Sequence, residues 1–188
     1  MSNVEILRHP TEEDWGLAKR AALCTIGKKR VLTMPNDEWK HKILRARHSP
    51  IRVLMYAIFI DPLPSWVATH FVRHVHMQPF VQTQRNDRQS NYDRRGARQD
   101  EPVMEMLWTD AEELMTVANK RLCGQASEET RAQMRDICEA VIETNPEMGP
   151  FLVPFCMEYG CHEFESCSNP RKYLPRNGPH YREGDDVE

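Results

Sequence analysis

Residues Trp66 to Arg98 read WVATHFVRHVHMQPFVQTQRNDRQSNYDRRGAR, and the character of the stretch changes along its length. The first part is an amphipathic apolar run with three histidines, and the rest is polar and cationic. Its arginines are Arg73, Arg85, Arg88, Arg94, Arg95 and Arg98. No lysine lies among them, and a guanidinium presents a planar fork of donors that fits a phosphate group. The stretch therefore predicts a nucleotide or phosphate site, with a solvated basic loop as the alternative.

Amide and hydroxyl side chains lie among these arginines and suit hydrogen bonds to a base or a sugar. They are Gln78, Gln82, Thr83, Gln84, Asn86 and Asn91. Residues Phe80 to Arg85 are expected to form a short strand or an extended lining of the site. The polar segment from Gln89 to Pro102 is expected to be a functional loop, because long loops without secondary structure usually carry a function.

The 188-residue chain is long enough for one domain with a substantial core. Its hydrophobic fraction of 40% and charged fraction of 28% are typical of a soluble globular protein. The net charge of -3 gives no overall attraction to nucleic acid, so a nucleic-acid partner is not expected. There is no apolar run of about 18 residues for a membrane helix and no signal-peptide pattern. Six cysteines are then interpreted as reduced thiols, which predicts a cytoplasmic protein without a membrane partner.

Hydrophobic periodicity and capping residues predict both strands and helices. Strands are expected at 4–7 and 51–60, and Asp61 to Pro64 is expected to break the second. Helices are expected at 12–24, from about 37 to 47, from 65 to about 74, at 109–122 and at 127–144. Residues 66, 67, 71 and 75 are expected to face inward. Residues 1–167 are expected to form one domain and residues 168–188 a flexible tail.

Three segments of the chain follow a known arrangement. Arg73-His74-Val75 is followed by seven residues and then by Thr83, with Arg85 two positions later. Upstream, His48-Ser49-Pro50 precedes an apolar strand, and downstream lies the run from Leu114 to Arg131. The matching residues in that run are Arg121, Ala126, Glu129 and Arg131. In order and spacing, these segments resemble the flavin-dependent thymidylate synthases.

The resemblance implies an α+β fold, a single domain in which a small, mainly antiparallel sheet packs with helices. It implies a homotetramer whose active sites lie between subunits. It also implies an enzyme that converts dUMP to dTMP, with FAD as cofactor and with NADPH and methylenetetrahydrofolate as co-substrates. In such an enzyme the flavin carries the difficult chemistry, and the protein binds and orients the reactants.

The resemblance also implies roles for individual residues. Its catalytic set corresponds here to Arg73, His74, Thr83, Arg85 and Arg121. Its nucleotide contacts correspond to Arg73, Gln82, Thr83, Gln84, Arg85 and Arg121. Its cofactor contacts correspond to Ser49, His74, Val75, Gln78, Asp110 and Thr116. The residue types agree with the nucleotide assignment, because guanidinium groups suit a phosphate dianion.

Several positions depart from the family pattern. Val75 stands where the family has arginine, and Arg52 stands where it has glutamate. Asp110 and Glu112 stand where the family has asparagine and arginine, both of which contact the cofactor. A carboxylate beside a pyrophosphate would be repulsive. An alternative therefore stays open: a protein of the same fold that acts on another deoxypyrimidine monophosphate, or that only binds a nucleotide or nucleic acid.

The C-terminal run CMEYGCHEFESC, residues 156–167, contains a group of metal-ligating residue types. They are Cys156, Cys161, His162 and Cys167. One interpretation is a zinc site with Cys123 or Cys138 as a further ligand. The spacing matches neither CxxC nor paired knuckles, so the favoured interpretation is free thiols and no metal.

Overall fold

The computed structural model describes residues 3–29, 33–85, 87–88 and 93–185. Of the polar residues named above, Asn86 and Asn91 lie outside this part. The elements, with η for a 3-10 helix, are β1 Val4–Arg8, α1 Glu12–Thr25, α2 Asp37–Arg45, η1 Ser49–Val53, β2 Met55–Pro64, α3 Ser65–Val72, β3 Gln78–Val81, η2 Arg94–Gly96, β4 Pro102–Asp110, α4 Ala111–Arg121, α5 Glu128–Thr144, η3 Pro146–Phe151 and α6 Phe155–Tyr159. None of the helices in the described ranges is long and apolar enough to cross a membrane.

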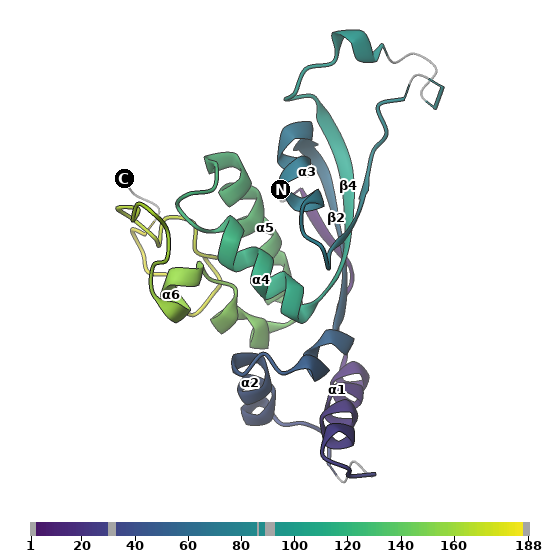
Figure 1. Cartoon of the computed structure of the whole chain (residues 1–188), viewed down its shortest axis with the longest axis vertical. Helices are drawn as coiled ribbons and strands as arrows, with labels where there is room; N and C mark the ends of the chain where they lie inside the picture. The colour runs from purple at the N-terminus through teal and green to yellow at the C-terminus, as the bar shows by residue number, and fades with distance from the viewer. Residues whose placement is uncertain (1–2, 30–32, 86, 89–92, 186–188) are drawn as a thin grey trace.

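The strands form one antiparallel sheet of four strands in the order β1-β2-β4-β3. The two central strands, β2 and β4, pair from Met55 opposite Asp110 to Pro64 opposite Pro102. Figure 1 shows α3, α4 and α5 together on one side of this sheet. The buried core lies between the sheet and these helices, and it includes Ile58, Phe71, Leu107 and Leu114. The predicted α+β fold, a single domain with a small antiparallel sheet and packed helices, is confirmed.

Strand β4 lies inside the sheet, although the sequence analysis predicted no strand there. Its residues alternate between the two faces of the sheet. The buried positions are Val103, Glu105, Leu107 and Thr109. On the open face, Met104 and Trp108 are 40% and 37% exposed. A glutamate on the buried face and large apolar residues on the open face invert the usual pattern, so the alternation does not identify a strand.

The predicted bounds of the second strand were wrong. Residues Ser49 to Val53 form η1, and β2 runs from Met55 to Pro64. The segment from Asp61 continues the strand beyond a register shift between Ile60 and Leu63. An irregularity of this kind accommodates proline within a sheet, which the prediction did not allow for.

Two details of the helices also differ from the predictions. Helix α4 begins at Ala111 rather than at 109, because Thr109 still pairs with Tyr56 in the sheet. Asp110 caps this helix, and its carboxylate accepts a hydrogen bond from the Glu113 backbone N–H at 2.9 Å. Helix α3 ends at Val72, so Val75, which was expected to face inward, is 88% exposed.

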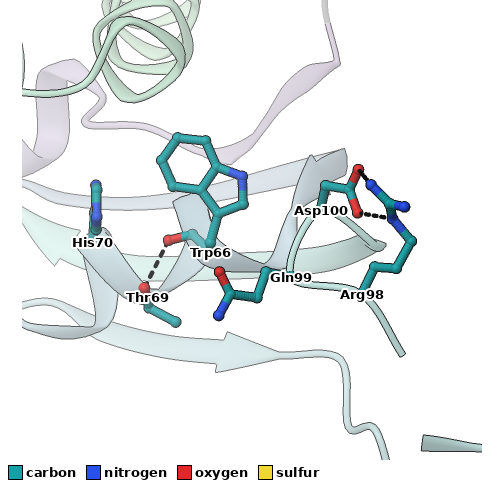
Figure 2. Close-up of a pocket in the computed structure, with 6 residues that line it drawn as sticks. All are labelled: Trp66, Thr69, His70, Arg98, Gln99 and Asp100. Carbon is teal, nitrogen blue, oxygen red and sulfur yellow. Dashed lines mark hydrogen bonds and ion pairs between the residues drawn. The ribbon is translucent and has the colours of Figure 1, made fainter. Parts of the chain in front are cut away.

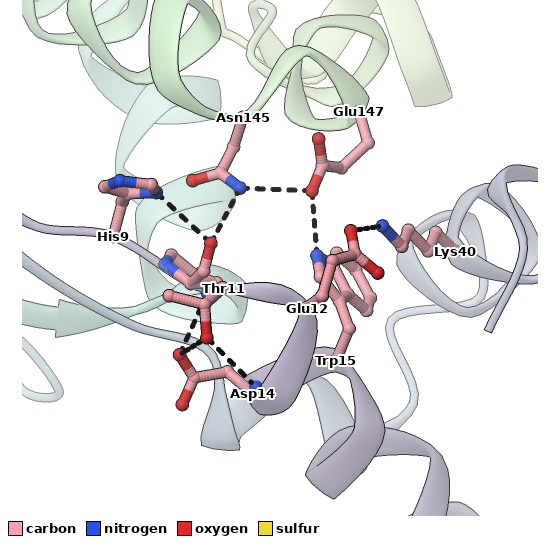
Figure 3. A network of polar contacts seen from close by, with 9 residues as sticks. His9, Thr11, Glu12, Asp14, Trp15, Lys40, Asn145 and Glu147 are labelled. Carbon is pink, nitrogen blue, oxygen red and sulfur yellow. Dashed lines mark hydrogen bonds and ion pairs between the residues drawn. The ribbon is translucent and has the colours of Figure 1, made fainter. Parts of the chain in front are cut away.

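The predicted start of α1 is confirmed, because Thr11 and Asp14 form a capping box. The next residue, Trp15, is buried and donates from Nε1 to Glu147 Oε1 at 2.8 Å. Lys40 of α2 is only 6% exposed and lies over the Trp15 ring. Figure 3 marks the Trp15–Glu147 bond and an ion pair of Lys40 with Glu12. These contacts join α1 to α2 and to η3.

Residues 160–185 contain no helix or strand, yet part of this segment is buried. Tyr173 and Leu174 are 7% and 0% exposed, and the Tyr173 hydroxyl donates to Glu128 Oε1 at 2.5 Å. The Arg131 guanidinium lies 4.5 Å above the same ring. Figure 1 shows the segment in yellow beside α6, on the side of the helical layer that faces away from the sheet.

Candidate functional site

Arg121, the last residue of α4, reaches across to the end of α3. Its Nε donates to Nε2 of His74 at 3.0 Å, and its Nη2 donates to the backbone carbonyl of His70 at 2.8 Å. Two residues that the sequence places 47 positions apart are therefore in direct contact. Together they connect the ends of two helices on the same side of the sheet.

The imidazole of His74 is partly buried and stays neutral over a wide pH range. Burial, followed by the positive charges of Arg121 and Arg73, lowers the pKa of His74 to about 4. Because Nε2 accepts the bond from Arg121, the neutral ring carries its proton on Nδ1. Nδ1 in turn lies 3.7 Å from Oε1 of Glu113. The ring is therefore bonded to Arg121 on one side and faces the Glu113 carboxylate on the other.

Arg73 brings a second guanidinium to this place. It is the C-cap residue of α3, and its side chain is exposed. Burial lowers the pKa of Arg121, and the charge of Arg73 lowers it further. Two guanidinium groups that the fold holds near one another favour an anion between them, because the anion relieves their repulsion. The pair can therefore hold a phosphate group.

An open cavity of about 800 Å³ adjoins this cluster. It is lined by Trp66, Thr69, His70, Arg98, Gln99 and Asp100. Figure 2 shows the Trp66 indole between His70 and an ion pair formed by Arg98 and Asp100. The backbone N–H of Trp66 donates to the carbonyl of Gln99 at 3.0 Å, which holds this loop against the start of α3. A cavity of this size, with one indole ring and a few polar groups, suits a small organic ligand.

Four residues predicted to bind the nucleotide follow β3 in an extended segment. They are Gln82, Thr83, Gln84 and Arg85. Gln82 continues the pairing with β4, since its N–H donates to the Met104 carbonyl at 2.8 Å. Arg85 forms two bonds with Asp87, at 2.9 and 2.6 Å. A cavity of about 270 Å³ lies between this segment and α3. The described contacts of Arg85 thus lie on this segment and do not reach Arg121.

Two residues with predicted cofactor contacts, Asp110 and Thr116, line another cavity, of about 310 Å³. Its other lining residues are Arg52, His76, Glu112 and Glu113. Arg52 forms an ion pair with Glu112, which leaves two further carboxylates in the lining and gives the cavity an acidic character. The other residues with predicted cofactor contacts lie outside this lining, and they are Ser49, His74, Val75 and Gln78.

Glu113 is a residue of the site that the sequence analysis missed. It is 9% exposed and lies between the His74 ring and the acidic cavity. Burial raises the pKa of Glu113; the nearby His76 opposes this shift, and the carboxylates of Asp110 and Glu112 reinforce it. The sequence contained one indication that Glu113 belongs to the site. Glu113 and Arg121 are eight residues apart, so they lie on a similar side of one helix.

A second group of reactive side chains lies beyond the end of α4. Its thiols are those of Cys123, Cys156, Cys161 and Cys167, and with His162 they line a cavity of about 20 Å³. Cys138, by contrast, is fully buried in α5 and does not belong to the group. The six cysteines are free thiols. Within the described ranges, no group of three or more His, Cys, Asp or Glu side chains is arranged so that it could hold a metal ion.

The fold is that of a known class, the flavin-dependent thymidylate synthases. Two solved structures of thymidylate synthase ThyX from Helicobacter pylori, each with FAD and dUMP, match this chain with TM-scores of 0.65 and 0.66. The matches cover 81% and 79% of this chain and 99% of each ThyX chain, at 12% sequence identity. Neither a protein-family model nor the sequence of a curated protein matches. The likeness therefore establishes the fold.

Proposed function

We propose that this chain binds a deoxypyrimidine monophosphate, foremost dUMP, with its phosphate between Arg73 and Arg121. We further propose that it acts as a flavin-dependent thymidylate synthase-like enzyme. The reaction would convert dUMP to dTMP, with methylenetetrahydrofolate as carbon donor, FAD as cofactor and NADPH as reductant. Support comes from the fold, which resembles structures that hold FAD and dUMP, and from the residues that follow the family signature.

One observation carries the nucleotide part of this proposal: the contact between Arg121 and the end of α3. It fixes the Arg121 guanidinium beside Arg73, and in the described part of the chain Arg73 has no carboxylate partner. Charge-assisted bonds from two oriented guanidiniums are strong and directional. Five N–H donors are present on each guanidinium, so Arg121 keeps donors for a ligand after its two internal bonds.

The segment after β3 would complete the nucleotide site. Thr83, Gln82 and Gln84 offer hydroxyl and amide groups that suit a pyrimidine base and its sugar. Arg85 is occupied by Asp87, so its use in binding requires an exchange of this carboxylate for the nucleotide phosphate. A phosphate dianion carries more negative charge than a carboxylate and accepts the same bidentate bonds, which favours the exchange.

FAD would supply hydride-transfer chemistry when bound. The acidic cavity lined by Asp110, Glu112 and Glu113 does not fit its pyrophosphate, because a single arginine, Arg52, stands against three carboxylates there. This mismatch favours a second candidate function, a protein that keeps the nucleotide site without flavin chemistry. Both candidates share the arginine site and differ only in the cofactor.

We also propose a homotetramer in the cytoplasm. The open face of the sheet presents apolar side chains, among them Phe80 at 56% exposure and Trp108 at 37%. Apolar groups gathered on an open face are typical of a contact surface between proteins. Free thiols are typical of a reducing compartment.

An absorption spectrum of the purified protein, before and after addition of FAD and dUMP, tests the proposal. Visible flavin bands that shift when dUMP is added support the enzyme, and NADPH oxidation in the presence of dUMP and methylenetetrahydrofolate would then be measured. A colourless protein that takes up no FAD but binds dUMP supports the second candidate. Failure to bind either compound contradicts both.

A further inference from the structure

Four cysteines from three separate parts of the chain converge at one place. Cys123 follows α4, Cys156 lies in α6, and Cys161 and Cys167 lie in the segment beyond it. The thiol of Cys156 interacts electrostatically with the other three. At Gly124, an added Cβ would lie only 2.5 Å from the Cβ of Cys167, so the close approach of this loop requires glycine there.

The cavity that these four thiols help to line is small. It measures about 20 Å³, which is close to the least volume that holds one water molecule. Phe155 and Gln125 form part of its wall, and the His162 ring lies edge-on to Phe155 at a centroid distance of 5.2 Å. Glu163 and Glu165 complete the lining, and the Cys123 thiol donates to Glu163 Oε1 at 3.7 Å. The cavity is thus enclosed by sulfur, imidazole, aromatic, amide and carboxylate groups.

The loop that carries two of the thiols has no core of its own. Residues 159–166 are all exposed, and Phe164 is fully so. A side-chain bond from Gln125 Nε2 to the Glu165 carbonyl, at 2.8 Å, nevertheless ties this loop to the end of α4. Segments that cannot bury apolar surface are commonly held by disulfides or by a bound metal. The cysteines are free thiols as placed, and a thiolate-bound metal is one such means.

We infer that Cys123, Cys156, Cys161 and Cys167 form a structural zinc site with four thiolate ligands. Zinc binds four thiolates in a tetrahedron with Zn–S distances of about 2.3 Å. Each thiol releases its proton to solvent when its sulfur binds the ion, and no atom changes oxidation state. Because the side chains as placed do not hold a metal, the sulfurs must move inward on binding, as happens where metal binding and folding are coupled.

Four protein ligands leave no open position on the ion, so the role of this site is to hold the structure together. It would fasten the C-terminal segment to the end of α4, two residues after Arg121. The spacing within residues 156–167 did not favour zinc because it matches neither CxxC nor paired knuckles. Of the two further ligands considered, the fold places Cys123, and not Cys138, beside the other thiols.

The first test is the metal content of the protein purified under reducing conditions, measured by inductively coupled plasma mass spectrometry. One zinc per chain is expected. After removal by a chelator, Co(II) should bind with the same stoichiometry and give the intense thiolate-to-cobalt charge-transfer absorption of a tetrahedral thiolate site. Wild-type protein that contains no zinc and takes up neither zinc nor cobalt overturns the inference. So do disulfides that pair these four cysteines in the unreduced protein.

Matched variants then identify the ligands. Cys161→Ser, at an exposed position, should lose the zinc and the cobalt absorption. Cys24→Ser, exposed on α1, and His162→Ala should both keep one zinc per chain. Retention of a full equivalent by Cys161→Ser, or equal loss by Cys24→Ser, contradicts the assignment. These measurements do not involve nucleotide binding, so they test the zinc site independently of the proposed function.

Discussion

Arg121 donates from Nε to Nε2 of His74 at 3.0 Å, and this bond joins the ends of α4 and α3. It sets the proton of the neutral imidazole on Nδ1 and fixes the Arg121 guanidinium where the positive charge of Arg73 acts on it. A histidine in this setting acts as a fixed hydrogen-bond acceptor that orients an arginine. The nucleotide site we propose depends on this orientation.

Arg121→Ala is expected to weaken dUMP binding about 10- to 100-fold, since charge-assisted bonds contribute roughly 1.5–3 kcal/mol. Isothermal titration calorimetry measures the change. Arg20→Ala is the matched control, because it removes one positive charge from an exposed position on α1. An affinity that is unchanged in Arg121→Ala, or reduced equally in both variants, would remove Arg121 from the site.

The depressed pKa of His74 predicts loss of stability in acid. In the unfolded chain the imidazole takes up a proton near its ordinary pKa, whereas in the folded protein it does so only near pH 4. The stability that the neutral His74 imidazole allows the folded protein is therefore fully present above about pH 6.5. The free energy of unfolding falls as the pH drops toward 4, by about 2 kcal/mol after allowance for partial exposure. Urea unfolding at several pH values measures this slope. His74→Gln should flatten it, and an unchanged slope in that variant would assign the acid sensitivity to other groups.

Glu105 is fully buried in β4, and among the described residues neither carboxylate oxygen has a hydrogen-bond partner. Burial raises the pKa of Glu105 to about 8, so the folded protein keeps this group neutral while the unfolded chain ionises above about pH 4.5. Stability should therefore decline from pH 5 to pH 8, with a cost at pH 7 of about 3 kcal/mol.

Glu105→Gln has no ionisable group at this position and should remove most of that decline. Chemical unfolding of both proteins at pH 5 and pH 8 tests it, and Glu101→Gln, at a partly exposed position in the preceding loop, serves as a control. If Glu105→Gln is as sensitive to pH as the wild type, the carboxylate is ionised in the folded protein and has a partner.

Arg52 and Glu112 form an ion pair with the charges exchanged relative to the family pattern, which has glutamate at the first position and arginine at the second. The double variant Arg52→Glu/Glu112→Arg should keep the pair and place a cation at the less exposed position, where Glu112 is 24% exposed. Each single variant should be destabilised through like-charge repulsion, and the double variant should regain most of the lost stability. We expect FAD to bind the double variant more tightly than the wild type. Destabilisation that simply adds in the double variant would show that the two residues do not interact.

Local signals predicted the helices well. Thr11, Asn36 and Ser127 each cap the start of a helix through their own side chains, so residues close in sequence determine where α1, α2 and α5 begin. The resemblance to the flavin-dependent thymidylate synthases likewise put Arg121 and His74 in one predicted catalytic set, and the fold brings them into contact.

The sequence alone did not predict contacts between residues that are far apart along the chain. Strand β4 is stabilised by pairing with β2 and β3, and the buried Glu105 obscures its alternation. Glu113 was indistinguishable from an ordinary acidic residue in the first turn of a helix. The sequence left Cys123 and Cys138 as equal candidates to join the other thiols, and the fold selects Cys123 because α4 ends beside α6 and the loop after it.

Titration of the wild-type protein with dUMP, and separately with deoxyuridine, tests the central claim most directly. We predict that one dUMP binds per chain, more weakly as the salt concentration rises. Deoxyuridine should bind far more weakly because it lacks the phosphate held by Arg73 and Arg121. Equal affinity for the two compounds, or no binding of dUMP, would contradict a phosphate site at these arginines.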